Sequence, residues 1–557
     1  MAQAPLFDPY DPYASQPSFW QQNGAWLAPV SVFLSTVVLT VMAFPPHSAP
    51  EFAYAFASPA VLWAYARPSL KLFAWTLFAA QGLAWIILLV WLRHVTWVGL
   101  FLLGPLVGAW VGSWYLAAWW AMPRLADRPA LVRMTVQLGL AGFWVLIEWS
   151  RTWLLSGFPW LPLAASQWQR TSILQISAYT GAYGVSFVLI MMNVGFAAYA
   201  HRLFREDSRS LLRRRSPEFM LALFLLLVCL TIQVRETFGR RAYQESLARI
   251  AFVQTDIPQT VKWDPADAPG IQATLQRLTQ AAAASRPDLI LWPESATPGA
   301  VRGDPAMQAS VDLLSAQAHV PLLIGSMAVV GTNAAGSKAF DAAFVVTPDL
   351  GVQTDYYAKR HLVPYGEYVP LRPILGWITK FVPLEYDITP GTDAAPLVIR
   401  LPNGSAAFGP LICYEDVFPQ LARASVRSGA DVLAVLTNDA WYGEEGAAYQ
   451  HAAHSVLRAV ETRRPVLRCG NAGWSGWIDE FGGIRATMAD ANGSVYFRGT
   501  ASVNITRDRR WSGVQSFYVQ HGDWFVFASA VLAVFSYALL TIGAAPARSG
   551  RASSLRP

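Results

Sequence analysis

Apolar segments long enough to approach the thickness of a bilayer dominate the first 235 residues of the chain. A transmembrane helix needs about 20 consecutive, mostly apolar residues. Eight segments come near that length, although the second and the seventh are short: 25–44, 52–67, 72–92, 96–121, 132–150, 172–200, 218–235 and 523–544. This pattern predicts a multi-span α-helical membrane domain with about eight transmembrane helices, seven before and one after a different kind of sequence.

The hydrophobic pattern changes near residue 236. From there to residue 516, short apolar runs alternate with amphipathic stretches and Gly/Pro turns. The predicted strands are RIAFVQ, DLILWP, PLLIGSMAVV, AAFVVT, AAFGPLIC and DVLAVLTN, and the predicted helices are 268–285, 304–318 and 447–462. We therefore expect four parts: a polar N-terminal extension (1–24), a membrane domain (25–235), an α/β domain (236–516), and a last span with a basic tail (517–557).

The distribution of positive charge predicts the orientation of the α/β domain. The composition, 54% hydrophobic and only 14% charged, fits an integral membrane protein. The pI near 9.2 can be interpreted only after the basic residues are located along the chain. Basic residues gather after the second, fourth and sixth spans and in the tail: Arg67, Lys71, Arg124, Arg128, Arg133, Arg202, Arg205, Arg209, Arg213, Arg214, Arg215, Arg548, Arg551 and Arg556. The opposite loops hold little beyond Arg93, Arg151 and Arg170. Because positive loops stay in the cytoplasm, the α/β domain is expected outside it, and the arginine run reads as a topology signal rather than a nucleic-acid site.

Three polar side chains follow apolar runs of the α/β domain, where strand ends bring distant segments together. They are Glu294, Lys359 and Cys413. A free thiol is only a few per cent thiolate at neutral pH, so a nucleophilic cysteine needs a neighbouring base or cation. Glu294 could accept the thiol proton, and Lys359 could stabilise an oxyanion. Spacing alone leaves the alternative open that Cys413 is a small buried core residue.

A resemblance in the motifs around these residues favours a nucleophilic Cys413 over a core residue. WPES, KRHLVPYGEYVP and GPLICYEDVFP resemble the three signature segments of the nitrilase superfamily. That resemblance implies an α-β-β-α sandwich and a catalytic triad of Glu294, Lys359 and Cys413. AFPP, SGFPWLPLAASQ, YGVSF, VQTDIPQTVKWD and TNDAWYG further resemble the membrane-bound branch of that superfamily, the apolipoprotein N-acyltransferases. Tyr365 and Tyr442 stand where the family often has Phe, which bears on the shape of the pocket.

The resemblance implies a reaction and its partners. A fatty acyl chain would pass from a phospholipid to the N-terminal amine of the diacylglyceryl-cysteine of an apolipoprotein, by a ping-pong mechanism through a Cys413 thioester. No cofactor, metal or nucleic acid is expected. The expected setting is the bacterial inner membrane, with the catalytic domain on the periplasmic side of a monomer.

Further residues receive supporting roles in this interpretation. Glu367, Tyr414 and Glu415 are expected to support the triad, and Trp263 and Trp441 are expected to contact substrate, although core packing is an alternative for Trp263. The apolar stretch 370–384 is expected to form a mobile lid or membrane-dipping arm, with a packed loop as the alternative. Three other expectations concern structure: a structural role for His361, an ion pair between Glu148 and Arg151, and no metal site at His451 and His454.

Three alternative functions are compatible with parts of this sequence. A membrane-tethered nitrilase-type amidase would employ the same triad with water as the second nucleophile, yet would not need eight spans and an apolar arm. A pseudo-enzyme that only binds lipoproteins is disfavoured by the intact Glu294, Lys359 and Cys413. A transporter with an appended domain is disfavoured because the spans contain few internal charges.

Overall fold

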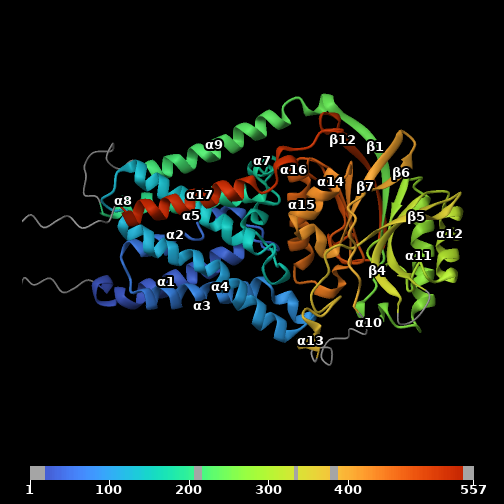
Figure 1. Cartoon of the computed structure of the whole chain (residues 1–557), viewed down its shortest axis with the longest axis horizontal. Helices are drawn as coiled ribbons and strands as arrows, with labels where there is room; N and C mark the ends of the chain where they lie inside the picture. The colour runs from blue at the N-terminus through green and yellow to red at the C-terminus, as the bar shows by residue number, and fades with distance from the viewer. Residues whose placement is uncertain (1–18, 206–215, 332–335, 377–386, 543–557) are drawn as a thin grey trace, which may run out of the picture.

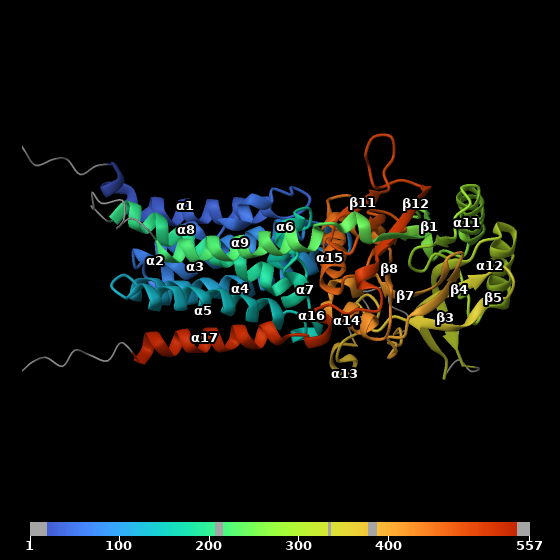
Figure 2. The ribbon, with the colours of Figure 1, turned by 90° about the horizontal axis from the view of Figure 1, so that it is seen from above.

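The computed structural model describes residues 19–205, 216–331, 336–376 and 387–542. It consists of a bundle of long helices joined end-on to a two-sheet sandwich (Figure 1). The chain leaves the bundle after Thr237, builds the sandwich, and returns along the bundle through its last helix (Figure 2).

Seven helices of the described residues are long and apolar enough to cross a membrane. They are α1 (Phe19–Ala43), α3 (Leu70–Leu88), α4 (Trp97–Ala121), α5 (Ala130–Ser150), α8 (Ala182–Arg205), α9 (Pro217–Thr237) and α17 (Trp524–Ile542). Each corresponds to one of the predicted apolar segments.

The second predicted span, 52–67, is not a continuous helix. It contains η1 (Pro50–Tyr54) and α2 (Ser58–Tyr65), and the eight residues of α2 rise only about 12 Å. The chain nevertheless returns across the bundle here. Pro45 accepts a hydrogen bond from the sandwich residue Gln450 (3.1 Å), whereas Pro68 accepts one from Trp119 at the far end of α4 (2.8 Å). The eight predicted crossings are therefore present, one of them in an interrupted form.

The interruption is tolerated because a neighbouring helix satisfies its backbone. Asn193 of α8 accepts a hydrogen bond from the Ala57 amide (2.7 Å) and donates to the Ala53 carbonyl (2.9 Å). Irregular backbone at membrane depth requires such partners within the protein. Continuous apolar composition could not distinguish this broken segment from a straight helix.

The predicted span 172–200 begins too early. Its first residues form two short helices, α6 (Thr171–Leu174) and α7 (Ser177–Thr180), and Gly181 (φ +69°) turns the chain before α8 begins. The amide of Ala182 then donates to Glu461 of the sandwich (2.8 Å). α7 packs against α15 and α16, whereas α6 packs against α8, α9 and η5. Burial in protein and burial in lipid leave the same hydrophobic pattern.

The sandwich has two six-stranded sheets. The first, in the order β12-β1-β2-β3-β4-β5, comprises β1 (Gln244–Gln254), β2 (Leu289–Leu291), β3 (Leu322–Val330), β4 (Lys338–Thr347), β5 (Gly351–Ala358) and β12 (Gly499–Asp508). The second, in the order β11-β10-β9-β8-β7-β6, comprises β6 (Leu397–Leu401), β7 (Gly404–Ile412), β8 (Val432–Thr437), β9 (Val466–Gly470), β10 (Gly476–Ile478) and β11 (Ile484–Thr487). Within them β1-β2-β3 and β7-β8-β9 are parallel.

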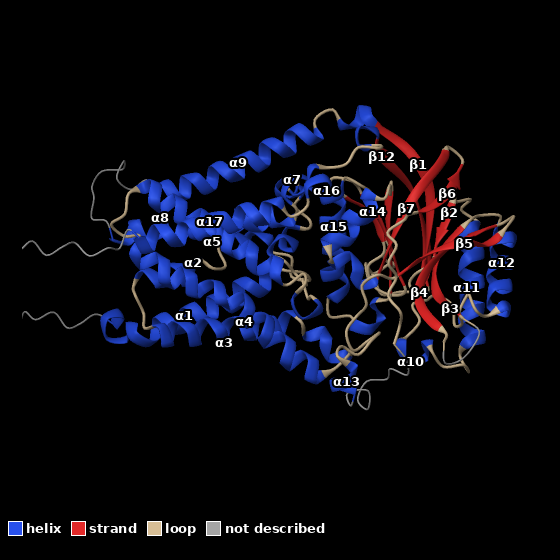
Figure 3. Ribbon diagram, viewed as in Figure 1, coloured by secondary structure: helices blue, strands red, loops and turns tan. Residues whose placement is uncertain are grey.

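Helices cover the outer face of each sheet (Figure 3). The first sheet carries α11 (Ala268–Ala283) and α12 (Pro305–Ala318), and the second carries α14 (Pro419–Arg427) and α15 (Ala447–Thr462). The shorter helices are α10 (Gln259–Lys262), α13 (Arg372–Leu375), α16 (Phe517–His521), η2 (Val90–His94), η3 (Met122–Arg124), η4 (Leu154–Ser156), η5 (Leu163–Gln167), η6 (Arg240–Tyr243), η8 (Cys413–Val417), η9 (Asp439–Tyr442) and η10 (Arg509–Trp511). The predicted α-β-β-α sandwich is confirmed, as are all six predicted strands and three predicted helices.

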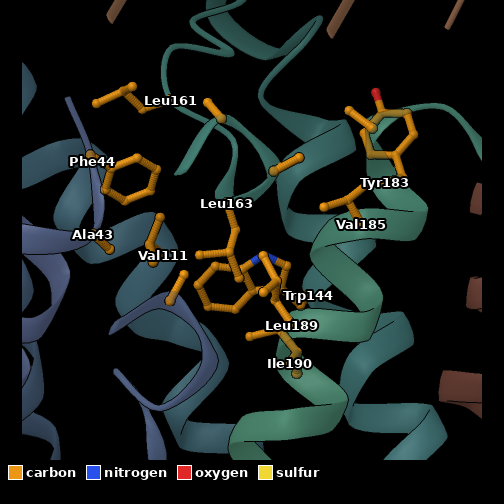
Figure 4. Close-up of a cluster of buried hydrophobic side chains, with 14 of the residues drawn as sticks. Ala43, Phe44, Val111, Trp144, Leu161, Leu163, Tyr183, Val185, Leu189 and Ile190 are labelled. Atoms are coloured by element: carbon orange, nitrogen blue, oxygen red, sulfur yellow. The ribbon is translucent and has the colours of Figure 1, made fainter. Parts of the chain in front are cut away.

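The α14–α15 layer lies between the second sheet and the bundle. All of α15 except Tyr449 is buried, and one hydrophobic core continues from this layer into the bundle. In the bundle, Phe44 and Val111 lie on one side of Trp144 and Leu163, and Leu189 and Ile190 of α8 lie on the other (Figure 4). This shared core fixes the sandwich to the end of the bundle.

Gln450 of α15 adds hydrogen bonds between the sandwich and the bundle at the same junction. Its amide nitrogen donates to the carbonyls of Pro45 (3.1 Å) and Leu88 (2.9 Å). Its amide oxygen accepts from the indole nitrogens of Trp91 (3.0 Å) and Trp160 (2.8 Å). A fully satisfied buried amide rigidifies its surroundings, so the second sheet is held firmly against the membrane domain.

Candidate active site

Three strand ends meet between the two sheets. Glu294 follows β2 and Lys359 follows β5 in the first sheet, whereas Cys413 follows β7 in the second. All three side chains are buried, with exposed fractions of 7%, 0% and 4% respectively. The structure thus brings the three predicted residues into one buried site, which we call the pocket, where electrostatic interactions are strong.

The backbone bends sharply at Cys413. Its φ is +51°, a left-handed conformation that costs energy for a residue with a side chain, and η8 begins there. The Glu415 carboxylate holds this elbow by accepting hydrogen bonds from the amides of Ile412 (2.7 Å) and Arg360 (2.7 Å) and from the hydroxyl of Tyr357 (2.7 Å). Glu415 therefore ties the turn that carries the thiol to the segment that carries Lys359.

A charge-balanced group lies beneath the elbow. We call His451, Arg468, Asp416 and Asp439 the elbow cluster. Arg468 contacts both carboxylates, Asp416 at 3.1 Å and Asp439 at 3.0 Å. His451 contacts them at 2.8 and 2.9 Å, and its Nε2 lies 3.1 Å from the carbonyl oxygen of Cys413.

The charge state of the elbow cluster follows from its contacts. Burial and Arg468 lower the pKa of His451, but Asp416 and Asp439 outweigh them and raise it to about 9. The imidazolium therefore persists at neutral pH and donates to the Cys413 carbonyl. Our sequence reasoning missed this cluster. The signal for it was Arg468 inside the apolar run PVLRCG, since a charge in a buried strand requires a partner.

A second buried group surrounds the ammonium of Lys359. We call Lys359, Glu294, Glu367 and Asp341 the lysine cluster. The Lys359 Nζ lies 3.1 Å from Glu294 Oε1 and 3.5 Å from Asp341 Oδ2, and it also donates to Glu367. Oxygen atoms of the three carboxylates lie within 4.8 Å of one another, a donor set that can hold a metal ion. In this site the ammonium supplies the positive charge, and Asp341 was not predicted from the sequence.

Burial and charge set the protonation states at the three predicted residues. Burial opposes the charge of Lys359, but the carboxylates outweigh it and hold the pKa well above its usual value. Burial also raises the pKa of Glu294, yet Lys359 outweighs it and the net shift is downward. Burial, and then Glu294, raise the pKa of the Cys413 thiol well above its usual value. The thiol is therefore protonated at rest, beside an ionised carboxylate that can accept its proton.

A second lysine reaches the same pocket. Lys262 of α10 is buried, and its Nζ donates to the backbone carbonyl of Glu294 at 3.1 Å. Burial lowers its pKa to about 8. The next residue, Trp263, is 51% exposed with the Lys262 Nζ 5.9 Å from its ring centroid, so the alternative of core packing for Trp263 is wrong.

The remaining predicted residues differ in their contacts and exposure. The Tyr414 hydroxyl donates to the Gly157 carbonyl (3.2 Å), which joins the elbow to the loop after α5. Trp441 lies in η9 and is 38% exposed. Glu367 accepts a hydrogen bond from the amide of Val363 (2.8 Å) in addition to that from Lys359. His361 packs on Phe418, and burial lowers its pKa to about 4, which makes it a neutral packing residue.

The expected ion pair between Glu148 and Arg151 is wrong. Glu148 accepts hydrogen bonds from the indole of Trp144 (2.7 Å) and the amide of Leu163 (2.7 Å), while Arg151 donates to the carbonyls of Phe158 and Trp160. Both side chains serve the backbone of the loop after α5, because its buried carbonyl and amide groups need partners.

The expected lid, 370–384, is described only in part, because residues 377–386 lie outside the described ranges. The described portion contains α13 with Leu371 just before it, and Leu371 and Ile374 are 68% and 71% exposed. Nearby, the Tyr368 hydroxyl donates to Ser156 (3.2 Å), next to the exposed Leu155 in the loop after α5. Apolar side chains therefore face outward close to the junction of bundle and sandwich.

Comparison with known proteins agrees with this geometry. Residues 249–519 match the carbon-nitrogen hydrolase family, and residues 36–195 match the apolipoprotein N-acyltransferase N-terminal domain. The apolipoprotein N-acyltransferase of Geobacter metallireducens is 34% identical over 432 residues, covering 74% of this chain and 78% of that protein. The chain belongs to the apolipoprotein N-acyltransferase family.

Two further comparisons cover smaller parts of the chain. The apolipoprotein N-acyltransferase of Methylococcus capsulatus is 34% identical over 349 residues, which cover 61% of this chain and 63% of that protein. Among solved structures, an amidase from Nesterenkonia sp. AN1 is 16% identical, with a TM-score of 0.35, over 51% of this chain and all of that one. The family models and the sequence relatives confirm the resemblance seen in the motifs: the chain is an apolipoprotein N-acyltransferase family member, a membrane-bound acyltransferase, and the simple amidase alternative is not favoured.

Proposed function

We propose that Cys413 carries a fatty acyl chain, as a thioester, from a phospholipid to the N-terminal amine of the diacylglyceryl-cysteine of an apolipoprotein. One observation carries this proposal. A thiol on a strained elbow of the second sheet shares a dry pocket with the Glu294–Lys359 pair of the first sheet, at the end of a membrane-spanning bundle. Family membership supports the same substrates.

The first half-reaction acylates the enzyme. Glu294 accepts the thiol proton as the Cys413 sulfur attacks the ester carbonyl carbon of the phospholipid. Lys359 stabilises the resulting oxyanion together with a backbone N–H of the elbow. The carbon–oxygen bond then breaks, Glu294 returns its proton to the leaving glycerol oxygen, and a lysophospholipid departs.

The second half-reaction transfers the acyl group. The acceptor amine attacks the thioester carbonyl, and Glu294 now takes a proton from the attacking nitrogen. The carbon–sulfur bond breaks, and the same proton restores the Cys413 thiol. One carboxyl can serve both halves because it is a base when the nucleophile attacks and an acid when the leaving group departs. The reaction as written uses neither cofactor nor metal.

The membrane setting has a physical reason. Pulling an acyl chain into water costs about 0.8 kcal/mol per CH₂, or roughly 12 kcal/mol for a chain of sixteen carbons. The site must therefore meet its lipids at the bilayer. The exposed Leu155, Leu371 and Ile374 near the pocket support a role as contacts to lipid, with Trp263 and Trp441 as contacts to the substrates.

The same orientation supports a location in the bacterial inner membrane with the sandwich on the periplasmic side. Arg67, Lys71 and Arg124 belong to the bundle end remote from the sandwich, where Arg67 donates to the Pro123 carbonyl at 3.1 Å. Positive charge at that end is expected in the cytoplasm. We propose that a single chain suffices, because every residue of the reaction comes from it.

A labelled phospholipid tests the proposal. The purified protein is incubated with it, and mass spectrometry is used to find an acyl adduct on Cys413. Cys469→Ala is the matched control, because Cys469 is a buried thiol on β9 that donates to the Leu291 carbonyl at 3.4 Å. We expect the adduct in the wild type and in Cys469→Ala, and none in Cys413→Ala.

An adduct that survives Cys413→Ala would contradict the mechanism. The second step is followed with a diacylated lipopeptide. Formation of an amide on its N-terminus supports a transferase, whereas release of free fatty acid alone supports hydrolysis and hence the amidase-like rival.

A further inference from the structure

Asp341 lies in the pocket but has no task in the reaction described above. It is part of β4, where it pairs with Met327 of β3, and it alternates with Ala343 and Val345. Those two residues belong to the core between the sheets, so Asp341 faces the same interior and is 4% exposed. Its backbone carbonyl accepts a hydrogen bond from the Lys359 amide at 2.8 Å. The sheet therefore fixes this carboxyl beside Lys359.

The contacts of Glu294 leave one oxygen for Asp341. Glu294 Oε1 accepts from Lys359, whereas Oε2 is buried and has no hydrogen-bond donor within the described part of the chain. A buried acceptor without a donor costs about 1–3 kcal/mol. An oxygen of the Asp341 carboxyl lies within 4.8 Å of an oxygen of Glu294, and Asp341 Oδ1 accepts from the hydroxyl of Ser295 at 3.3 Å. Two carboxyl groups can share a hydrogen bond only if one of them carries a proton.

The balance of charges around Lys359 also indicates that one carboxyl group is protonated. Full ionisation would place three carboxylates around the single ammonium of Lys359, with Cys413 as a neutral neighbour. Lys262 brings a second ammonium, but it donates to the Glu294 backbone carbonyl rather than to a carboxylate. Like charges that share a dry site cannot all ionise, so one of the acids is expected to keep its proton.

Asp341 is better placed than Glu367 to hold that proton. Both oxygens of Glu367 already have donors, Lys359 on Oε1 and the Val363 amide on Oε2. Asp341 instead has Oδ2 3.5 Å from Lys359, and the neighbouring Glu294 keeps an oxygen, Oε2, that lacks a donor within the described residues. Burial and then Glu294 raise the pKa of Asp341 well above its usual value, which agrees with this assignment.

We propose that Asp341 is protonated in the working enzyme and donates a hydrogen bond to Glu294, so that the two carboxyls act as one acid–base unit. The inference rests on the proposed role of Glu294. The Asp341 proton is not transferred, since the mobile proton passes from Cys413 to Glu294 and on to the leaving oxygen. Asp341 is thus a positioning residue: it orients Glu294 and moderates its basicity, so that the proton taken from the thiol can be given up again.

Infrared spectroscopy tests the protonation state without any acyl substrate. The full-length protein is labelled with carbon-13 in aspartate, and the wild type is compared with Asp341→Asn at pH 7. We expect a carbonyl band of a protonated, buried carboxyl in the wild type that is lost in Asp341→Asn. Finding only ionised aspartate carboxylates would overturn the inference, and it would do so even if the acyl-transfer proposal itself held.

Kinetics separate positioning from a merely structural role. Asparagine can donate to Glu294 and accept from Ser295 as a protonated Asp341 would, whereas alanine cannot. We expect Asp341→Ala to lose about 10- to 100-fold in kcat, the equivalent of a lost buried hydrogen bond, and Asp341→Asn to recover about tenfold of it. The Asn variant should also lose the part of the decline in rate at alkaline pH that Asp341 ionisation causes.

Two outcomes of these assays would contradict the inference. One is an Asn variant as impaired as the Ala variant at equal thermal stability, which would mean that the charge of Asp341 is required. The other is activation of chelator-treated enzyme by a divalent cation, which would assign the three carboxylates to a metal. If Asp341→Ala fails to fold, the infrared comparison and the pH profile of Asp341→Asn still decide the matter.

Discussion

Two buried ionic clusters flank Cys413, and they differ in the balance of their charges. The elbow cluster sets two cations, His451 and Arg468, against two carboxylates, and each cation contacts both. The lysine cluster sets one cation, Lys359, against three carboxyl groups. A balanced cluster gains most by keeping its protons where they are, which suits a clamp. An unbalanced one can take up and release a proton, which suits acid–base chemistry.

The largest effect is expected from removing the single cation of the lysine cluster. Lys359→Met leaves three acids without an ammonium and removes the proposed oxyanion partner. We expect a loss of at least about 100-fold in acyl transfer, the size typical for one oxyanion donor. The measurement is single-turnover acylation of Cys413 by labelled phospholipid, corrected for the folded fraction. Lys359→Arg is the control, since it keeps the charge and changes the shape. Near-normal acylation in Lys359→Met would contradict the catalytic role that the comparison assigns to the lysine cluster.

The elbow cluster should instead respond mainly in stability. Arg468→Met leaves two buried carboxylates with only His451 between them, and breaking a buried ion pair in this way costs about 3–5 kcal/mol. We expect the free energy of unfolding to fall by that order, with a smaller loss in the acylation rate per folded molecule.

Arg507→Met provides the matched control for that experiment. Arg507 pairs with Glu245 at the surface, with side-chain exposures of 29% and 41%, so its loss should cost less than about 1 kcal/mol. Equal effects of Arg468→Met and Arg507→Met on unfolding would mean that the elbow cluster is not a clamp.

The pH dependence of stability sharpens the comparison further. The folded-state pKa of His451, about 9, exceeds its usual value of 6.5. The stabilisation it provides is therefore complete below pH 6.5 and is lost as pH rises through 9, up to about 3 kcal/mol in total. Thermal unfolding between pH 7 and pH 10 should show this decline in the wild type. His451→Gln should start lower and lack most of the decline; parallel curves would refute an imidazolium at this position.

The sequence allowed prediction of the site residues that lie in short, recognisable motifs. Glu294, Lys359 and Cys413 follow apolar runs in recognisable segments, and the structure brings them together. Asp341 and Arg468 were not predicted as parts of the site. A charge inside an apolar run indicates that a partner exists but does not identify the partner. The partners of Arg468, for example, come from η8 and η9, 52 and 29 residues away. Such pairings are set by the packing of the two sheets and their helices.

The membrane domain shows the same limit in a different form. Apolar length alone located all seven long helices found among the described residues, since hydrophobic segments of that length have few other uses. It could not reveal that 52–67 is interrupted, because the hydrogen bonds of Asn193 that permit the break come from α8. Nor could it separate α7, which is buried against α15 and α16, from a segment buried in lipid.

The smallest effect is expected outside both clusters, at the exposed contact between η2 and the sandwich. Arg93 and His94 pair with Glu445, but their side chains are 38–39% exposed and that of Glu445 is 30% exposed. Solvent and salt screen such a pair, so Glu445→Gln should cost less than about 1 kcal/mol in unfolding and should leave acylation of Cys413 within experimental error. Unfolding measured at low and high salt should show the difference from the wild type shrinking as salt is added. A loss as large as that of Arg468→Met would mean that exposure does not separate this contact from the buried clusters, and the contrast between clamp and surface pair would fall with it.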